Sequence, residues 1–343
     1  MRTVSIIIDG ISNSGGTDKV ATLLSNEFSQ LGYKAIIYPL KKGEPYYPVN
    51  DKVIISCKYK NRYLNLISAF KNIKNSNTDV IIISMGRLSL ECGFLIRLFN
   101  AKNNFICSDH VSLASFSKMK RILKLNAYKH YTSIAVLTEA DKKNLENEKL
   151  FIPIKVIRNI SSFNNNKNIY KYKSNVVIAI GRLSYQKNFS RLIDIWCEMD
   201  TIGWELKIIG DGEEKINLLT KINKRDCKNI NIVNATKNIE NYYKDAALLA
   251  MTSRYEGLPM VLIEAKSFAL PVIAFDCETG PKEIICKDGV LINYRDDESY
   301  IKEFQLLLNN ESVRKELSNN ARKNSEKYSP NYIIQQWKEL LSD

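Results

Sequence analysis

The 343-residue sequence has no long apolar stretch, and this absence excludes a membrane-spanning helix. Such a helix needs roughly 18 consecutive apolar residues, and no segment approaches that length. The short apolar run at residues 4–8 passes directly into Asp9-Gly10, which is typical of a buried first strand and not of a signal peptide. We therefore expect the protein to remain in the cytoplasm.

The cysteines give no sign of a disulfide framework or of a metal site. The seven cysteines are odd in number, include no Cys-x-x-Cys pair and lie mostly in apolar stretches. Cysteines of this kind are commonly small core residues in a reducing compartment. We expect all seven to be reduced.

Acidic residues are scarce in the first half of the chain, although the whole sequence carries a net charge of +13. Residues 1–161 contain 24 lysines and arginines against 12 acidic residues, whereas residues 162–343 contain 26 against 25. This asymmetry predicts an anionic partner for the first half. The candidates are a phospholipid surface, a diphosphate-bearing substrate and nucleic acid.

Short β-branched runs alternate with longer helix-like segments along the whole chain. The predicted strands are residues 4–8, 35–38, 53–56, 80–84, 104–107, 134–137, 155–157, 176–180, 205–209, 230–233, 247–251 and 272–275. Continuous apolar strands separated by helices are typical of parallel sheets covered on both faces. The polar segment 161–168 separates two such series. We predict an α/β protein with two Rossmann-like, doubly wound parallel-sheet domains that face each other across a cleft, at 1–161 and 176–328, joined by a linker at 162–175.

The strongest motif follows the predicted strand at 247–251. Gly257 permits a sharp turn and Pro259 suits the start of a helix. The backbone N–H groups at that turn would form an anion site, with Glu256 at its mouth and Glu264 more than one helical turn further on. The residues of the turn are Gly257, Leu258 and Met260. From spacing alone, solvated glutamates beside an ordinary strand–turn–helix explain the pattern as well.

Three other predicted strands end in loops of interest. Residues 181–188, Gly-Arg-Leu-Ser-Tyr-Gln-Lys-Asn, place Arg182 and Lys187 five positions apart. The loop after the first strand carries Gly15-Gly16 but lacks the Gly-x-Gly-x-x-Gly fingerprint of a dinucleotide site. His110 follows the strand at 104–107. Taken alone, each of these features is more typical of a solvated or structural loop.

In this order, the segments resemble the motifs of family-4 retaining glycosyltransferases, which have the two-domain GT-B fold. Residues 256–264 resemble the family's Glu-x7-Glu motif with its Glu-Gly-x-Pro core, and residues 181–188 resemble its Gly-Arg-Leu-x-x-x-Lys-Asn segment. The glycine pair is similar to the family's Gly-Gly loop. His110 matches a family histidine that commonly follows Glu, where this chain has Asp109. The resemblance covers nearly the whole chain.

The resemblance implies a role for each of these residues. Glu256 would contact the hydroxyls of the donor sugar and Glu264 the ribose. Arg182 and Lys187 would hold the donor diphosphate, where positive charge stabilises the leaving group. His110 would contact the donor sugar, and the backbone of Gly15 and Gly16 would approach the donor phosphates. A final helix, at 329–343, would return to the first domain.

Residues 275–285 resemble the segment that follows the Glu-x7-Glu helix in transferases that build bacterial surface polysaccharides. The family resemblance therefore extends to this group of enzymes. It implies transfer of a hexose or N-acetylhexosamine from a nucleotide diphosphate sugar, expected to be a UDP-sugar, to a lipid-diphosphate-linked oligosaccharide in O-antigen, capsule or exopolysaccharide assembly, with an α-linkage. The sequence has no Asp-x-Asp pair, the usual divalent-cation ligand of the other main glycosyltransferase fold. We expect no metal and no cofactor.

Two alternatives remain at this point. A sugar-nucleotide epimerase or hydrolase on the same fold would need no acceptor. A basic nucleic-acid-binding protein would account for the pI near 9.2, but the sequence lacks interleaved aromatic and basic residues, so we expect no nucleic-acid partner.

A basic helix is predicted at residues 117–129. Lys120, Arg121 and Lys124 share one face of it with Tyr128. A solvated face is one interpretation. The other is a surface, extended by the basic run 58–63, that docks on anionic lipid at the inner face of the cytoplasmic membrane and holds the acceptor.

Overall fold

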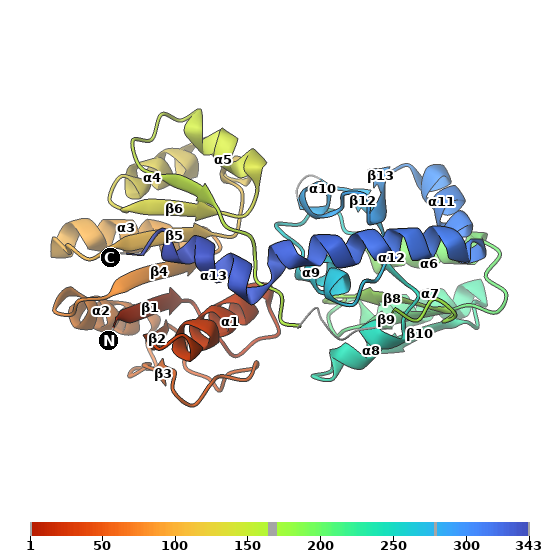
Figure 1. The fold of residues 1–343 in the computed structure, drawn as a ribbon, viewed down its shortest axis with the longest axis horizontal. Coiled ribbons are helices and arrows are strands. Elements are labelled where there is room, and N and C mark those ends of the chain that lie inside the picture. The colour runs from red at the N-terminus through yellow and green to blue at the C-terminus, as the bar shows by residue number, and fades with distance from the viewer. Residues whose placement is uncertain (1, 164–169, 278–279, 342–343) are drawn as a thin grey trace. The chain divides into compact units, whose positions relative to one another are not determined.

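The computed structural model describes residues 2–163, 170–277 and 280–341. The chain forms two compact units (Figure 1). The first comprises residues 1–160 with 330–343, and the second comprises residues 161–329. Part of the predicted linker, residues 164–169, lies outside the described residues. None of the helices in the described ranges is long and apolar enough to cross a membrane.

The first unit is built on a parallel sheet of seven strands in the order β3-β2-β1-β4-β5-β6-β7. The strands are β1 Thr3–Ile8, β2 Lys34–Pro39, β3 Ile54–Ile55, β4 Asp79–Ser84, β5 Phe105–Asp109, β6 Ser133–Val136 and β7 Ile154–Val156. The chain order reverses between β1 and β4, which makes this pair the topological switch point of a doubly wound sheet. Ligands of such sheets bind outside the carboxyl ends of the strands at this point.

The helices of the first unit are α1 Gly16–Gln30, α2 Arg62–Lys74, α3 Arg87–Phe99, η1 Leu113–Ser115, α4 Lys118–Tyr128, α5 Glu139–Glu146 and α13 Pro330–Lys338. Phe70 of α2 stacks on Phe105 of β5 in the core, with ring centroids 5.7 Å apart. The last helix, α13, packs beside α1 and buries Trp337. The amide of Asn104 donates to the carbonyl oxygen of Leu340 at 2.8 Å, which joins the end of the chain to this sheet.

The second unit repeats the plan with six parallel strands in the order β10-β9-β8-β11-β12-β13. The strands are β8 Val176–Ile180, β9 Glu205–Ile209, β10 Ile230–Val233, β11 Leu248–Met251, β12 Val272–Asp276 and β13 Gly289–Asn293. The helices are α6 Phe189–Glu198, α7 Lys215–Arg225, α8 Ile239–Asp245, α9 Met260–Ser267, α10 Pro281–Ile284, α11 Asp297–Asn309, α12 Glu311–Ser325 and η2 Glu326–Tyr328. The switch point lies between β8 and β11.

The fold class predicted from the sequence, two doubly wound parallel-sheet α/β units, is confirmed. All twelve predicted strands are present within one or two residues, except that β3 keeps only two residues of the predicted four. The strand β13 was missed. Its apolar run Val290-Leu291-Ile292 is short and follows the charged turn Lys287-Asp288.

The expectation of seven reduced cysteines is wrong for two of them. Cys197 and Cys227 form a disulfide with their Cα atoms 6.2 Å apart. Cys197 lies in the last turn of α6 and Cys227 follows the end of α7, and these two helices pack together. Helix packing therefore brings together two thiols that are 30 residues apart in the chain.

Candidate functional site

Two loops of the second unit meet at the switch point of its sheet. Residues 181–188 follow β8 and residues 252–259 follow β11, and these strands are neighbours. Lys187 and Glu256, one from each loop, form an ion pair with Nζ and Oε1 2.6 Å apart. Their side chains are 16% and 7% exposed, so the pair is largely shielded but still reached by solvent. The structure thus brings together two residues that the sequence motifs predicted separately.

Arg254 joins the two loops by hydrogen bonds. It was not predicted as a site residue. Its Nη2 donates to Asn188 Oδ1 at 2.8 Å, and its Nε donates to the carbonyl oxygen of Tyr185 at 3.1 Å. Gln186 donates to the carbonyl oxygen of Tyr255 at 3.0 Å. The sequence contained a signal for this role, since Arg254 is a cation inside the motif itself, two positions before the first glutamate.

Arg182 lies in the first of these loops but is not joined to the Lys187–Glu256 pair by any contact described. Its side chain is 75% exposed and pairs with Glu213 at 3.2 Å. Exposed ion pairs of this kind contribute about 0–1 kcal/mol. A stronger anion could therefore replace Glu213 at little cost.

Glu264 is held in place deep in the second unit. It is 4% exposed, and its Oε2 accepts a hydrogen bond from the Tyr243 hydroxyl of α8 at 2.9 Å. Its Oε1 accepts from Ser162 at 3.4 Å. The ring of Tyr243 stacks on Phe268 with centroids 5.1 Å apart, which fixes the hydroxyl. Tyr243 was missed because nothing local in the sequence links it to the motif.

The turn before α9 is shaped by a glycine from another segment. Gly257 is exposed, Leu258 is buried and Met260 begins α9. Gly257 does not adopt a positive φ, whereas Gly280 has a φ of +95°. A Cβ on Gly280 would lie 2.2 Å from the carbonyl oxygen of Gly257. Gly280 therefore allows its own segment to approach the turn closely, whereas Gly257 does not need the positive φ that a sharp glycine turn often has.

In the first unit, the glycine pair opens α1. Gly15 is the N-cap of α1 and Gly16 its first residue, and both are exposed. Asp18 accepts a hydrogen bond from the N–H of Asn13 at 2.9 Å, which closes the loop on itself. The exposed backbone and the helix N-terminus suit the approach of an anion.

His110 lies directly beyond β5, beside the end of β4. The backbone N–H of His110 donates to the carbonyl oxygen of Ser84 at 2.8 Å, and the ring Nε2 lies 3.2 Å from the hydroxyl of Ser108. Burial lowers the pKa of His110 to about 4, although the neighbouring charge of Asp109 opposes this shift. The imidazole is therefore neutral near pH 7.

The basic face predicted for α4 is wrong at Lys124. That side chain is 2% exposed and pairs with Asp109, with Nζ and Oδ2 2.6 Å apart. Arg121 is partly exposed and pairs with Glu148, and Lys120 is exposed. Helical periodicity places Lys124 beside the other cations of the helix, but the buried carboxylate of Asp109 on β5 binds its side chain in the interior.

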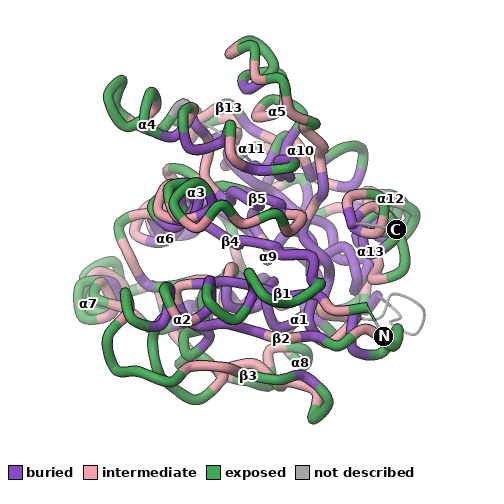
Figure 2. The backbone as a smooth tube through the Cα atoms, turned by 90° about the vertical axis from the view of Figure 1, so that its left-hand side faces the viewer, coloured by how far each residue is buried: buried purple, intermediate pink, exposed green. Residues whose placement is uncertain are grey.

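Much of the outer face of α4 is apolar. Met119, Ile122 and Leu123 are 72%, 60% and 50% exposed, and the exposed Lys118 and Lys120 flank Met119. The helix accordingly appears mostly in the exposed colour in Figure 2. No acidic residue occurs between residues 118 and 129.

Not all of the charges in the basic run 58–63 face solvent. Arg62, at the start of α2, lies 2.7 Å from both Asp9 Oδ1 and Glu91 Oε2. Asp9 follows β1, so this group of charges sits at the switch point of the first sheet. These residues were not predicted as site residues, although Asp9 directly follows the predicted first strand.

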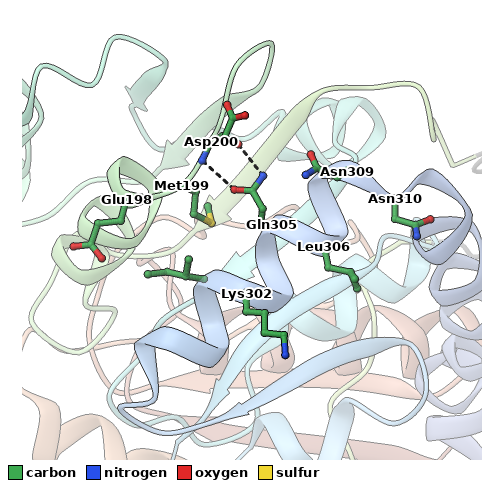
Figure 3. A pocket seen from close by; sticks show the side chains of 9 residues that line it. Glu198, Met199, Asp200, Lys302, Gln305, Leu306, Asn309 and Asn310 are labelled. Carbon is green, nitrogen blue, oxygen red and sulfur yellow. Dashed lines mark hydrogen bonds between the residues drawn. The ribbon is translucent and has the colours of Figure 1, made fainter.

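An open hollow of about 570 Å³ lies away from the predicted residues (Figure 3). It is lined by Glu198, Met199, Asp200, Ile301, Lys302, Gln305, Leu306, Asn309 and Asn310. Asp200 and Gln305 bridge it with two hydrogen bonds of 2.9 Å. It lies between the end of α6 and α11 and contains no carboxyl end of a strand, so we do not assign the site to it. Across the described residues, no group of three His, Cys, Asp or Glu side chains is arranged to hold a metal.

Comparison with known proteins supplies the family. Residues 161–324 match the family described as "Glycosyl transferases group 1". The chain is 45% identical over 351 residues to the amylovoran biosynthesis glycosyltransferase AmsD of Erwinia amylovora, with all of both chains covered. It is 26% identical over 362 residues to a Campylobacter jejuni enzyme, with 100% of this chain and 99% of that enzyme covered. That enzyme is named GalNAc-alpha-(1->4)-GalNAc-alpha-(1->3)-diNAcBac-PP-undecaprenol alpha-1,4-N-acetyl-D-galactosaminyltransferase.

Among solved structures, S. aureus TarM in a complex that includes UDP superposes with a TM-score of 0.83 at 17% identity, over all of both chains. At this identity the likeness establishes the fold alone. The two parallel-sheet units are those of a GT-B fold.

Proposed function

Since the chain belongs to the group 1 glycosyltransferase family, we propose that it transfers a hexose or N-acetylhexosamine from a nucleotide diphosphate sugar to a lipid-diphosphate-linked oligosaccharide in surface-polysaccharide assembly. The name of AmsD supports the polysaccharide role, and the name of the Campylobacter jejuni enzyme supports an acceptor carried on a lipid diphosphate. The UDP bound to TarM supports a UDP-sugar donor.

The observation that carries the proposal is the Lys187–Glu256 pair at the switch point of the second sheet. A donor diphosphate would compete with the carboxylate for Lys187 and would take Arg182 from its exposed partner Glu213. Glu256, released from Lys187, would then accept hydrogen bonds from the sugar hydroxyls. Both cations would stabilise the charge that develops on the diphosphate as the glycosidic bond breaks.

Glu264 and the glycine loop complete the donor site in this proposal. The carboxylate of Glu264, oriented by Tyr243, would accept hydrogen bonds from the ribose. The backbone of Gly15 and Gly16 would approach the phosphates, and the neutral His110 would contact the donor sugar. The acceptor hydroxyl would attack the anomeric carbon on the face from which the diphosphate leaves, so an α-linked donor yields an α-linked product. No metal or cofactor takes part.

We propose that the outer face of α4 contacts the membrane, in place of the basic face predicted from the sequence. We define it as Met119, Ile122 and Leu123 with Lys118 and Lys120, and we place it at the inner leaflet of the cytoplasmic membrane. Apolar side chains among lysines are typical of helices that lie in the interface of anionic bilayers. Each cation near such a surface contributes about 1 kcal/mol. Lys124 has no part in this contact, because it is buried.

The test is a donor and acceptor screen. The purified protein is incubated with UDP-hexoses and UDP-N-acetylhexosamines, with and without a synthetic lipid-diphosphate saccharide, and the products are examined by mass spectrometry and by NMR at the anomeric carbon. We expect a single added sugar in α-linkage that requires the acceptor. Conversion of the donor without acceptor would instead establish the epimerase or hydrolase.

A further inference from the structure

A buried polar cluster in the first unit joins α4 to the end of β5. We call Asp109, Lys124, Tyr128 and Ser89 the Asp109 cluster. Three donors converge on one oxygen, Asp109 Oδ2: Lys124 Nζ at 2.6 Å, the Tyr128 hydroxyl and the Ser89 hydroxyl at 3.4 Å. All four side chains are buried.

The same cluster holds the backbone that leads into α3. Lys124 Nζ donates to the carbonyl oxygen of Gly86 at 3.3 Å and to Ser89 Oγ at 3.1 Å. The N–H groups of Gly86 and Ser89 donate in turn to the hydroxyl of Ser84, the last residue of β4, at 2.8 and 3.0 Å. One continuous network from α4 therefore supports the ends of both β4 and β5.

His110 depends on these two strand ends. It directly follows Asp109, its N–H is bound by the carbonyl oxygen of Ser84, and its ring contacts Ser108. The network therefore anchors both Ser84, which accepts the backbone hydrogen bond of His110, and Asp109, which precedes His110 in the chain. A displacement of Asp109 would move the imidazole directly.

Stabilisation alone does not account for this arrangement. Moving an ammonium and a carboxylate out of water costs several kcal/mol per ion, and apolar replacements of such pairs are often neutral or stabilising. The helices α3 and α4 are already joined by close packing next to the cluster, where a Cβ on Gly93 would lie 2.7 Å from the carbonyl oxygen of Ala127. Packing therefore already holds the two helices together, and the charged hydrogen bonds fix the orientation of the groups that they join.

We propose that Lys124 and Tyr128 are positioning residues, which act through Asp109 to hold His110 in the geometry required for sugar transfer. This inference rests on the proposed function, in which His110 contacts the donor sugar. Lys124 and Tyr128 themselves do not touch substrate.

The first test compares two buried tyrosines. Tyr128→Phe removes a donor from Asp109, whereas the matched control Tyr131→Phe removes a hydrogen bond to the carbonyl oxygen of Ser89. We expect Tyr128→Phe to lower kcat by about tenfold to a hundredfold, as a small misplacement of a contact group does. We expect the KM for the donor to stay within about twofold, and Tyr131→Phe to keep a kcat within about twofold of wild type. Equal effects of the two variants on kcat would overturn the proposal.

The second test separates positioning from stability. The double variant Asp109→Asn/Lys124→Met removes both charges and avoids an unpaired buried ion, so we expect it to fold with thermal stability near that of wild type. Its kcat should nevertheless stay at least about tenfold low. A stable double variant with wild-type kcat shows that the cluster is structural only.

The third test does not depend on sugar transfer. The chain has only two histidines, His110 and His130, so histidine-selective isotope labelling yields two sets of ring signals, which His130→Gln assigns. We expect the His110 ring signals to shift or broaden in Tyr128→Phe and in the double variant, and to be unchanged in Tyr131→Phe. Unchanged signals in all three variants overturn the positioning role, even if the donor screen detects no transfer. Failure of that screen with perturbed His110 signals refutes only the proposed function.

Discussion

Each unit contains a Lys–carboxylate pair near the carboxyl end of a strand of its parallel sheet, and the two pairs differ in exposure. The pair of the second unit lies at the switch point, beyond β8 and β11, whereas the pair of the first unit lies at the end of β5, one strand away from the switch point. In the second unit, Lys187 and Glu256 are 16% and 7% exposed, and both come from loops. In the first unit, Lys124 and Asp109 are 2% and 3% exposed and join a helix to a strand. A pair that solvent reaches can exchange its partner for a ligand, whereas a fully buried pair can only hold the structure around it.

The largest expected effect is the loss of stability in Lys124→Met. The substitution leaves the carboxylate of Asp109 buried without its cation, and removing one partner of a buried pair costs about 3–5 kcal/mol. Hydrogen exchange is followed in peptides from β5 at increasing urea concentrations. Because β5 belongs to the first unit, this measures the unfolding of that unit separately from the second. Lys120→Met, in the same helix but exposed, is the control and should cost less than about 0.5 kcal/mol. Equal stability of the two variants would abolish the distinction between the pairs.

Lys187→Ala tests the more exposed pair, in the second unit. We expect kcat/KM to fall by about 100-fold or more, as for loss of an electrostatic donor to the leaving group. Stability should fall less than in Lys124→Met, because solvent reaches the Lys187–Glu256 pair. Steady-state kinetics and thermal unfolding measure the two effects, with Lys215→Ala as a control cation that pairs with Asp211 on the surface. A folded Lys187→Ala protein with near-normal turnover contradicts the assignment.

Tyr243→Phe tests Glu264, a buried carboxylate of the second unit that accepts hydrogen bonds from hydroxyl groups. Glu264 loses the hydroxyl that orients it, and a hydrogen bond to a charged group is worth about 1.5–3 kcal/mol. We expect the KM for the donor to rise about tenfold, with a smaller change in kcat. Titration calorimetry with UDP checks this directly, and Tyr242→Phe, the neighbour on α8, is the control. Unchanged affinity for UDP would remove Glu264 from the donor site.

The outer face of α4 tests whether the two sides of one helix act independently. Lys118→Glu/Lys120→Glu should weaken binding to anionic vesicles, at about 1 kcal/mol per cation near the surface. Met119→Ser/Ile122→Ser should weaken it as well, and salt should release the wild type. Donor binding in solution should not change. Vesicle sedimentation with neutral lipid as control measures this, and wild-type binding by both variants would reduce the face to an ordinary solvated surface.

The smallest expected effect is that of metal removal. If lysine and arginine side chains carry the positive charge of the donor site, excess EDTA should leave most of the activity intact. Initial rates with and without EDTA, then with added Mg²⁺ or Mn²⁺, decide this. Full dependence on a divalent cation would direct attention to Asp276, at the end of β12.

Local sequence determined the strands and the loops of the site. The β-branched runs predicted twelve strands because a strand buried on both faces needs an unbroken apolar segment. The loops at 181–188 and 252–259 were found because each is a contiguous motif directly after such a strand. The pairing of Lys187 with Glu256 follows once β8 and β11 are neighbours, but the motifs alone did not state it.

The tertiary structure alone decided which charges face water. The sequence placed Lys124 on a basic surface, because nothing in its own helix indicates a buried partner. Its partner is the carboxylate of Asp109, which belongs to the strand β5. Tyr243 and Cys227 were assigned no role for the same reason, since their partners Glu264 and Cys197 are 21 and 30 residues away. Periodicity reports how each segment is buried, whereas the identity of a buried partner depends on how segments distant in the chain pack together.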